Sequence, residues 1–122
     1  MKRLLLIFLT ILSVKTMAEW VEYDSDVNNN KYFYEAAKIH RQVDLVFVWH
    51  RTQYSIATEY GDYSSAAYYK INCLENTIQF LSITFYSDEN WLDKNWAGKQ
   101  GQINFIRPNS QEKKLQNIVC MN

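Results

Sequence analysis

This chain of 122 residues contains only one proline, three glycines, two cysteines and two histidines, and its formal net charge is zero. It has no internal repeat and no low-complexity tract, and so little proline and glycine is not typical of linkers or disordered segments. It also lacks a glycine-rich phosphate loop and any recognisable nucleophile motif. These absences argue against a repeat protein, a disordered protein and an enzyme that binds nucleotides.

The longest apolar run lies at the N-terminus. Lys2 and Arg3 precede apolar residues 4–14, and the small residues Thr16 and Ala18 follow. This order is typical of a secretory signal peptide with its cleavage site. The run is shorter than the roughly 20 residues that a membrane anchor requires. We therefore predict a signal peptide over residues 1–18 and one exported domain over residues 19–122, without a membrane anchor; an N-terminal core helix is the alternative.

The predicted mature domain is mildly acidic. Cleavage after Ala18 would remove three of the 13 basic residues and no acidic residue. Ten basic and 13 acidic residues would remain, which gives a net charge of −3. Binding to nucleic acid depends on clustered Lys and Arg, so we exclude it. No cysteine follows the leader, and we expect no lipid attachment there. The expected location is the periplasm, the cell surface or the medium of a Gram-negative bacterium.

The two cysteines, Cys73 and Cys120, both lie in the predicted domain. Thiols are not kept reduced outside the cytoplasm, so an even pair in an exported chain favours a disulfide. Such a bond would restrict the unfolded chain and stabilise this small domain by roughly 4 kcal/mol. Two buried free thiols are the alternative.

Aromatic residues are abundant, with nine Tyr, six Phe and four Trp. Because they alternate with polar residues, they favour strands. A change of apolar phase between Phe80 and Leu81 indicates either a β-bulge or a strand buried on both faces. We expect residues 88–101 to form a polar loop. The predicted strands are residues 20–23, 31–34, 44–54, 64–73, 77–87 and 102–106.

The C-terminal segment has the periodicity of a helix. Asn109, with Glu112 three residues later, is the predicted N-terminal cap. Leu115, Ile118 and Val119 recur at i, i+3 and i+4 and predict one apolar face that packs on the sheet. The predicted fold is α+β: an antiparallel sheet of about five to six strands, with one C-terminal helix packed on it and joined to it by the disulfide.

The residues that could carry chemistry are few. His40 and His50 are the only histidines, and Glu35 or Asp44 could assist one of them as a general base, but no nucleophile accompanies them. A metal site requires three or four convergent ligands, and no closely spaced set remains once the cysteines pair. We predict that the protein is not an enzyme, that it has no catalytic residue or metal site, and that both histidines are structural or superficial.

Four aromatic residues are candidates for a partner-binding surface. Trp91 and Trp96 fall in the predicted polar loop, and Tyr60 and Tyr63 lie in a turn-like segment. Exposed Trp and Tyr are residues on which protein contacts concentrate. For the two tryptophans we favour the alternative, in which they fold back over the end of the sheet.

Several segments resemble the surface-adhesin protein E family, and together they cover nearly all of the predicted domain. They are Glu19-Trp20-Val21, Tyr32-Phe33-Tyr34, Val46 to Trp49, Tyr69-Lys70-Ile71-Asn72-Cys73, Thr84-Phe85-Tyr86-Ser87, and a helix from Pro108-Asn109-Ser110 to Ile118-Val119-Cys120. The resemblance implies an antiparallel sheet, a C-terminal helix and a cysteine pair that links them.

The same resemblance implies a function. Members of the family adhere to host extracellular-matrix and serum glycoproteins of the vitronectin and laminin type, and haem binding and dimerisation are also attributed to the family. We therefore expect a non-enzymatic binding protein with a protein partner. A second hypothesis is a periplasmic inhibitor or immunity protein that blocks a hydrolase or toxin, which also suits a small, mildly acidic domain without catalytic residues.

Overall fold

The computed structural model describes residues 18–121, so the predicted signal peptide lies outside the described residues except for Ala18. The alternating aromatic pattern becomes a sheet, followed by one helix. The elements are β1 (Trp20–Ser25), β2 (Lys31–Glu35), a 3₁₀ helix (Ala36–Lys38), β3 (His40–Gln42), β4 (Leu45–Gln53), β5 (Ser64–Asn72), β6 (Thr77–Tyr86), β7 (Lys94–Gly98), β8 (Asn104–Phe105) and α1 (Gln111–Cys120).

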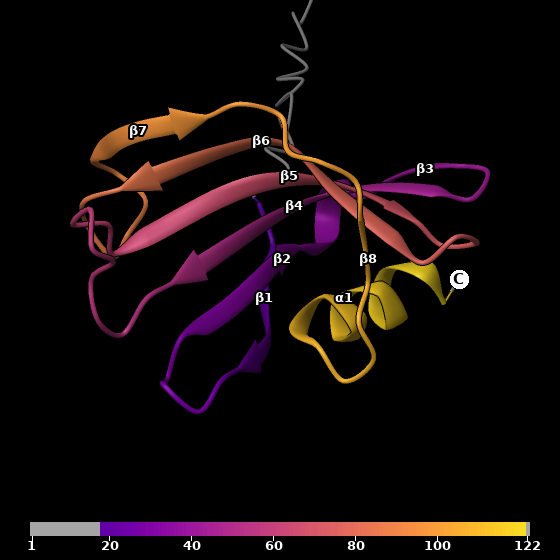
Figure 1. The fold of residues 1–122 in the computed structure, drawn as a ribbon, viewed down its shortest axis with the longest axis horizontal. Helices are drawn as coiled ribbons and strands as arrows, with labels where there is room; N and C mark the ends of the chain where they lie inside the picture. Colours follow the sequence, from indigo (N-terminus) through magenta and orange to yellow (C-terminus); the bar gives the residue numbers. More distant parts are fainter. Residues whose placement is uncertain (1–17, 122) are drawn as a thin grey trace, which may run out of the picture.

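All eight strands belong to one antiparallel sheet (Figure 1). Six of them form its continuous path, in the order β1-β2-β4-β5-β6-β7, and β3 and β8 lie off this path. β3 pairs with the first half of β4, and β8 pairs with the start of β6. α1 packs against one face of the sheet, and no other α-helix occurs between residues 18 and 121. The predicted α+β fold is confirmed, with eight strands in place of five or six.

The sequence does not predict β3 and β7. Every residue of β3 is exposed, and β7 is exposed except at Gly98, so neither strand shows an apolar alternation. β7 lies inside the segment predicted as a polar loop. Both strands are placed by main-chain pairing with a long neighbour, β4 or β6. The predicted strand over residues 102–106 is also shorter than expected and contains only Asn104–Phe105.

The change of apolar phase in β6 is a β-bulge. Tyr69 pairs with Phe80 and Tyr68 pairs with Ser82, which leaves Leu81 without a partner on β5. Because side chains alternate along a strand, the extra residue returns the apolar positions after the bulge to the face that Phe80 occupies. The bulge therefore keeps both halves of β6 in contact with the same side of the sheet.

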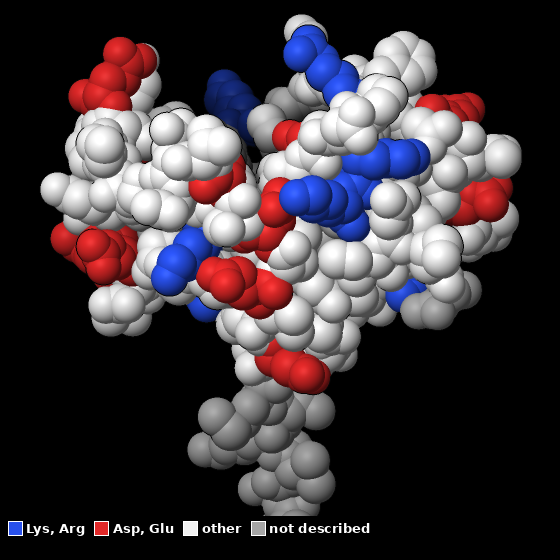
Figure 2. All heavy atoms as spheres, turned by 90° about the horizontal axis from the view of Figure 1, so that it is seen from below, with Lys and Arg blue, Asp and Glu red and all other residues white. Residues whose placement is uncertain are grey.

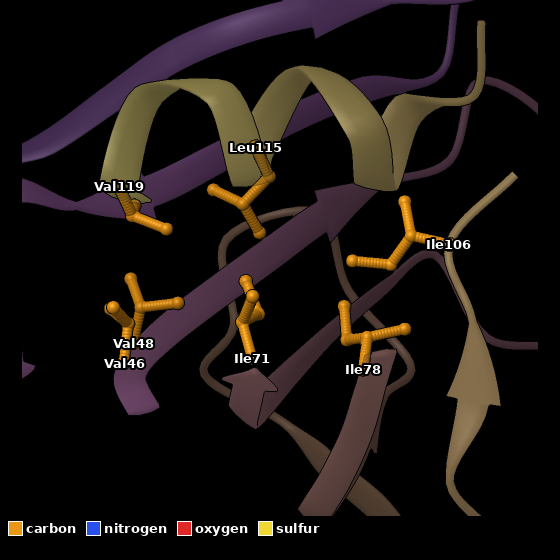
Figure 3. Packing of buried hydrophobic residues seen from close by; sticks show 7 residues of the cluster. All are labelled: Val46, Val48, Ile71, Ile78, Ile106, Leu115 and Val119. Atoms are coloured by element: carbon orange, nitrogen blue, oxygen red, sulfur yellow. The ribbon is translucent and has the colours of Figure 1, made fainter. Parts of the chain in front are cut away.

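The hydrophobic core lies between α1 and the sheet. Leu115 and Val119 are fully buried and point toward the strands (Figure 3). Burial of each aliphatic side chain of this size stabilises a fold by roughly 1.5–3 kcal/mol. The buried cluster consists of Val46, Val48, Ile71, Ile78, Ile106, Leu115 and Val119.

Two details of α1 differ from the prediction. Ser110 rather than Asn109 is the N-cap, and its Oγ accepts a hydrogen bond from the backbone N–H three residues later at 3.1 Å. Asn109 has a φ of 62°, a left-handed conformation that Asn tolerates. Ile118 is exposed, and Gln116 takes a buried place because its amide donates to Oδ1 of Asn76 at 2.7 Å.

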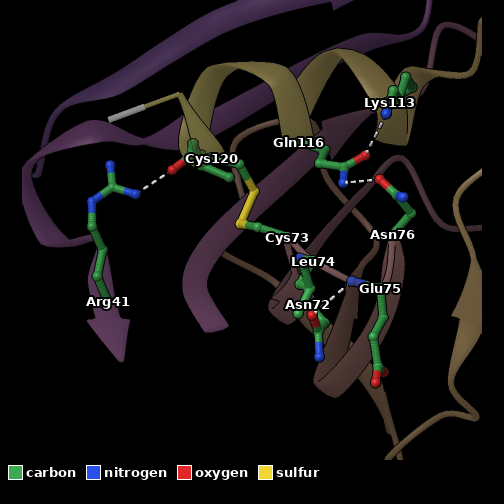
Figure 4. The surroundings of a disulfide bond; sticks show 10 residues. Arg41, Asn72, Cys73, Leu74, Glu75, Asn76, Lys113, Gln116 and Cys120 are labelled. Carbon is green, nitrogen blue, oxygen red and sulfur yellow. Dashed lines mark hydrogen bonds between the residues drawn. A yellow bond between two sulfur atoms is a disulfide. The ribbon is translucent and has the colours of Figure 1, made fainter. Parts of the chain in front are cut away.

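The predicted disulfide is present. Cys73 and Cys120 are bonded, with their Cα atoms 5.8 Å apart, so the bond joins the end of β5 to the last residue of α1 (Figure 4). Beside it, Nη1 of Arg41 donates to the backbone carbonyl of Val119. A cation is favourable at the C-terminus of a helix. The disulfide and Arg41 together fix this end of α1 to the sheet.

Candidate functional site

The four candidate aromatic residues lie near the end of the sheet where β4 and β6 end and β5 begins (Figure 1). Tyr60 and Tyr63 belong to the β4–β5 loop, Trp91 to the β6–β7 loop, and Trp96 to β7. The structure does not bring them together, because it places the two tryptophans on opposite faces.

Trp96 forms an exposed aromatic surface with Tyr60. Its ring stacks on Phe85, its partner across the strands, with the ring centroids 4.2 Å apart, and Tyr60 meets it edge-on at 6.3 Å. Trp96 is 40 % exposed and Tyr60 69 % exposed. With Asn95 they line an open pocket of about 390 Å³. We call Tyr60, Asn95 and Trp96 the Trp96 surface.

A buried carboxylate holds the Trp96 surface in place. Asp62 is completely buried. Its carboxylate accepts hydrogen bonds from Nδ2 of Asn95 at 2.8 Å, Nε1 of Trp96 at 3.1 Å and Oγ1 of Thr58 at 3.2 Å. A buried acceptor with several donors ties together the segments that supply them. Asp62 therefore fixes the β4–β5 loop against β7.

The sequence gives no signal for this role of Asp62. It lies in a Tyr-Gly-Asp-Tyr segment, and Asp occurs in many turns for local reasons. Only the fold shows that its partners lie 33 and 34 residues away, at Asn95 and Trp96. Tyr63, the last residue of this segment, is half-exposed but does not line the pocket of the Trp96 surface.

Trp91 folds back onto the other face of the sheet. It meets Phe33 edge-on with centroids 5.7 Å apart, and its Nε1 donates to the carbonyl of Ser65 at 2.9 Å. Phe33 pairs with Arg51, and the guanidinium of Arg51 lies 4.7 Å from the Trp91 ring centroid. Trp91 is thus a packing residue, whereas Trp96 is presented to solvent from a strand.

His50 belongs to the interior. It is 2 % exposed, and its Nε2 lies 2.7 Å from the hydroxyl of Tyr23 and 3.0 Å from Nε2 of Gln111. Because the Gln111 amide nitrogen is a donor, Nε2 of His50 accepts. Burial lowers the pKa of His50 to about 3, so the ring is neutral at physiological pH. His50 links β4 to β1 and to the start of α1.

His40 lies on the opposite face. It is exposed on β3, with its ring 5.7 Å from that of Phe47. His40 pairs with Phe47, an odd-numbered position of β4, whereas His50 occupies an even one, so the two rings project from different faces. A haem held between both histidines of one chain does not fit this arrangement. Within residues 18–121, no group of three or more His, Cys, Asp or Glu residues is placed to hold a metal ion.

The charged side chains give no broad field of one sign on the face in Figure 2, where basic and acidic groups lie side by side. The Trp96 surface itself contains no charged residue. Across the described part of the chain, no helix has the length and apolar character needed to cross a membrane.

Solved structures of other proteins share this fold. A crystal structure of Haemophilus influenzae protein E in its second crystal form aligns with a TM-score of 0.65 and 15 % identity, over 84 % of this chain and 87 % of that chain. The selenomethionine form of the same protein aligns with a TM-score of 0.66 and 15 % identity, over 84 % of this chain and 86 % of that chain. A crystal structure of protein E from non-typeable Haemophilus influenzae aligns with a TM-score of 0.59 and 14 % identity, over 89 % of this chain and 80 % of that chain.

In sequence, the chain matches the model of a protein family. No curated protein sequence matches this chain. At 14–15 % identity the crystal structures show a shared fold and nothing finer. The sequence model of the family described as Surface-adhesin protein E, however, matches residues 20–121, almost the whole of the described chain. The chain therefore belongs to the surface-adhesin protein E family.

Proposed function

We propose that this protein is an exported adhesin that binds a host extracellular-matrix or serum glycoprotein, and that the Trp96 surface makes the central contact. Family membership supports the class of function. The single observation that supports the site is that Trp96 is exposed and yet held in a fixed position by the stacked ring of Phe85 and the buried carboxylate of Asp62, with Tyr60 against its edge.

A rigid aromatic surface suits recognition of a protein. Tyr and Trp bury a large area and lose little conformational freedom on binding. The hydrogen bond to Asp62 and the stack on Phe85 already fix the ring of Trp96, so binding does not have to order it. Since the surface carries no charge, we expect the affinity to depend only weakly on salt.

Variants of the surface test this proposal. Residues 19–122, with the disulfide formed, would be measured by surface plasmon resonance against immobilised vitronectin and laminin. We expect Tyr60→Ala and Trp96→Ala each to weaken binding by about 30-fold, the effect of losing a hot-spot residue. Leu74→Ala is the control, because Leu74 is also exposed but lies in the β5–β6 turn at the opposite end of the sheet.

Far-ultraviolet circular dichroism and the midpoint of urea unfolding would confirm that each variant keeps its fold. Equal affinities for the wild type and both aromatic variants would remove the Trp96 surface from the proposal. A wild-type protein that binds neither glycoprotein would count against adhesion itself. A periplasmic inhibitor would then be the hypothesis to test, by capture of a hydrolase or toxin.

A further inference from the structure

The main chain just before β1 is bound to the sheet on both sides of one residue, Glu19. Its backbone N–H donates to Oε1 of Glu35 at 2.9 Å, and its carbonyl accepts from the backbone N–H of Ala36 at 2.8 Å. The next residue, Trp20, pairs with Glu35, and the centroid of its ring lies 4.1 Å from Cζ of Arg51. The backbone nitrogen of Glu19 therefore has a defined position beside one carboxylate.

That carboxylate lies in the interior. Glu35 is 2 % exposed, and its Oε1 also accepts from the backbone N–H of Ala37 at 2.9 Å, which caps the 3₁₀ helix. Its negative charge acts on the guanidinium of Arg51, but the two do not form an ion pair. The one ion pair in the described part of the chain joins Lys114 to Asp24. Because a buried carboxylate is costly unless it is paired and hydrogen-bonded, a cation that donates directly to Glu35 would stabilise the fold.

The predicted cleavage site would place a cation at this nitrogen. Ala18 and Glu19 are exposed and precede β1. Hydrolysis of the peptide bond between them consumes one water, leaves a carboxylate on Ala18 and converts the amide nitrogen of Glu19 into an α-amino group. Such a group has an ordinary pKa of about 7.7–8.0 and is therefore mostly protonated at neutral pH. The charge would appear on the atom that lies 2.9 Å from Oε1 of Glu35.

We propose that Glu35 is the receptor of the mature N-terminus: removal of the leader between Ala18 and Glu19 creates an ion pair between the new α-ammonium group and the buried carboxylate. A charge-assisted hydrogen bond replaces a neutral one and is about twice as strong. A cut one residue earlier would leave a neutral amide at this position, and a cut one residue later would remove the donor. The inference rests on the export that the proposed function includes, and not on adhesion.

Two mature forms that differ by one residue test the proposal. Each would be released from a fusion partner by a protease that leaves no extra residue, one form beginning at Glu19 and the other at Ala18. The longer form keeps the N–H donor of Glu19 but carries its ammonium group one residue away. In urea at pH 6.5, the form that begins at Glu19 should have an unfolding constant about tenfold smaller, the difference between a charged and a neutral hydrogen bond. Equal constants would overturn the proposal.

Glu35→Gln is the matched variant, because its amide oxygen can still accept from the backbone N–H groups of Glu19 and Ala37 while the charge is absent. In this variant the two forms should have unfolding constants within about twofold of each other. A tenfold difference that persisted in Glu35→Gln would not come from the carboxylate, and the proposal would be wrong.

Two measurements by mass spectrometry need no variant. The protein exported from the full chain should begin at Glu19, and any other N-terminus would contradict the proposal. Limiting acetic anhydride at pH 7 should acetylate the terminal amine of the form that begins at Glu19 about fivefold more slowly than that of the longer form, because an ion pair raises the pKa of the amine. Equal rates would also overturn the proposal. None of these results depends on glycoprotein binding, so failure of this proposal and failure of adhesion are distinguishable.

Discussion

Replacement of both cysteines by serine is expected to lower the free energy of unfolding by about 4 kcal/mol, because the bond between Cys73 and Cys120 closes a loop of 47 residues in the unfolded chain. The effect is large for a single domain, whose total stability is about 5–15 kcal/mol. α1 has only ten residues, and a helix of that length is not stable alone in water. Equilibrium unfolding in urea, with the oxidised wild type beside Cys73→Ser/Cys120→Ser, measures the difference.

Reduction supplies the matched control for this experiment. The reduced wild type should unfold at nearly the same urea concentration as the double serine variant, and a reductant should not affect the variant. If the oxidised wild type and the variant shared one midpoint, the disulfide would not be a source of stability, and packing of Leu115 and Val119 would have to hold α1 alone.

Acid is expected to destabilise the protein through His50. In the unfolded chain this ring takes up a proton near pH 6.5, whereas burial lowers its pKa in the folded protein to about 3. Between these values the unfolded state binds more protons than the folded state. The contribution of neutral His50 to the free energy of unfolding is therefore fully present above about pH 6.5 and is lost as the pH falls toward 3. The loss is about 1.4 kcal/mol per pH unit. Protonation would also place a donor against Tyr23 and Gln111.

The slope of stability against pH, measured by urea unfolding between pH 7 and pH 4, tests this expectation. His50→Gln cannot titrate, and its stability should change much less over this range, whatever its absolute value. His40→Gln is the matched control, because His40 is exposed, and it should keep the wild-type slope. A wild-type slope in His50→Gln would assign the acid sensitivity to other groups.

The sheet, the helix and the disulfide could be predicted because their signals are local in sequence. β4, β5 and β6 have long apolar alternations, and even the bulge at Leu81 shows as a change of phase. β3 and β7 give no such signal because their residues are exposed and their positions depend on pairing with β4 and β6. The exposure of Ile118 likewise follows from how α1 rotates on the sheet, which its own period does not determine.

The candidate site could be predicted only in part, because its contacts span the chain. Composition indicated Tyr60 and Trp96 but not the buried Asp62 that joins them. Composition also grouped Trp91 with Trp96, although the register of the strands separates them onto two faces. That Trp20 and Trp91 both contact the guanidinium of Arg51 depends on three segments far apart in the chain and could not be read from spacing.

The two faces of the sheet have different surroundings. α1 and the disulfide close one face around a small aliphatic core and the neutral His50. The opposite face has no α-helix over it in the part of the chain that the structure describes, and it carries the aromatic groups around Arg51. Among the described residues, α1 therefore covers only one face of the sheet.

Protease digestion of the tagged protein on intact cells, with cells permeabilised at the outer membrane as the control, tests our proposal that the protein is an adhesin that acts outside the cell. We expect the protein to be digested on intact cells. Protection on intact cells, with digestion only after permeabilisation, would contradict it and would place the protein in the periplasm.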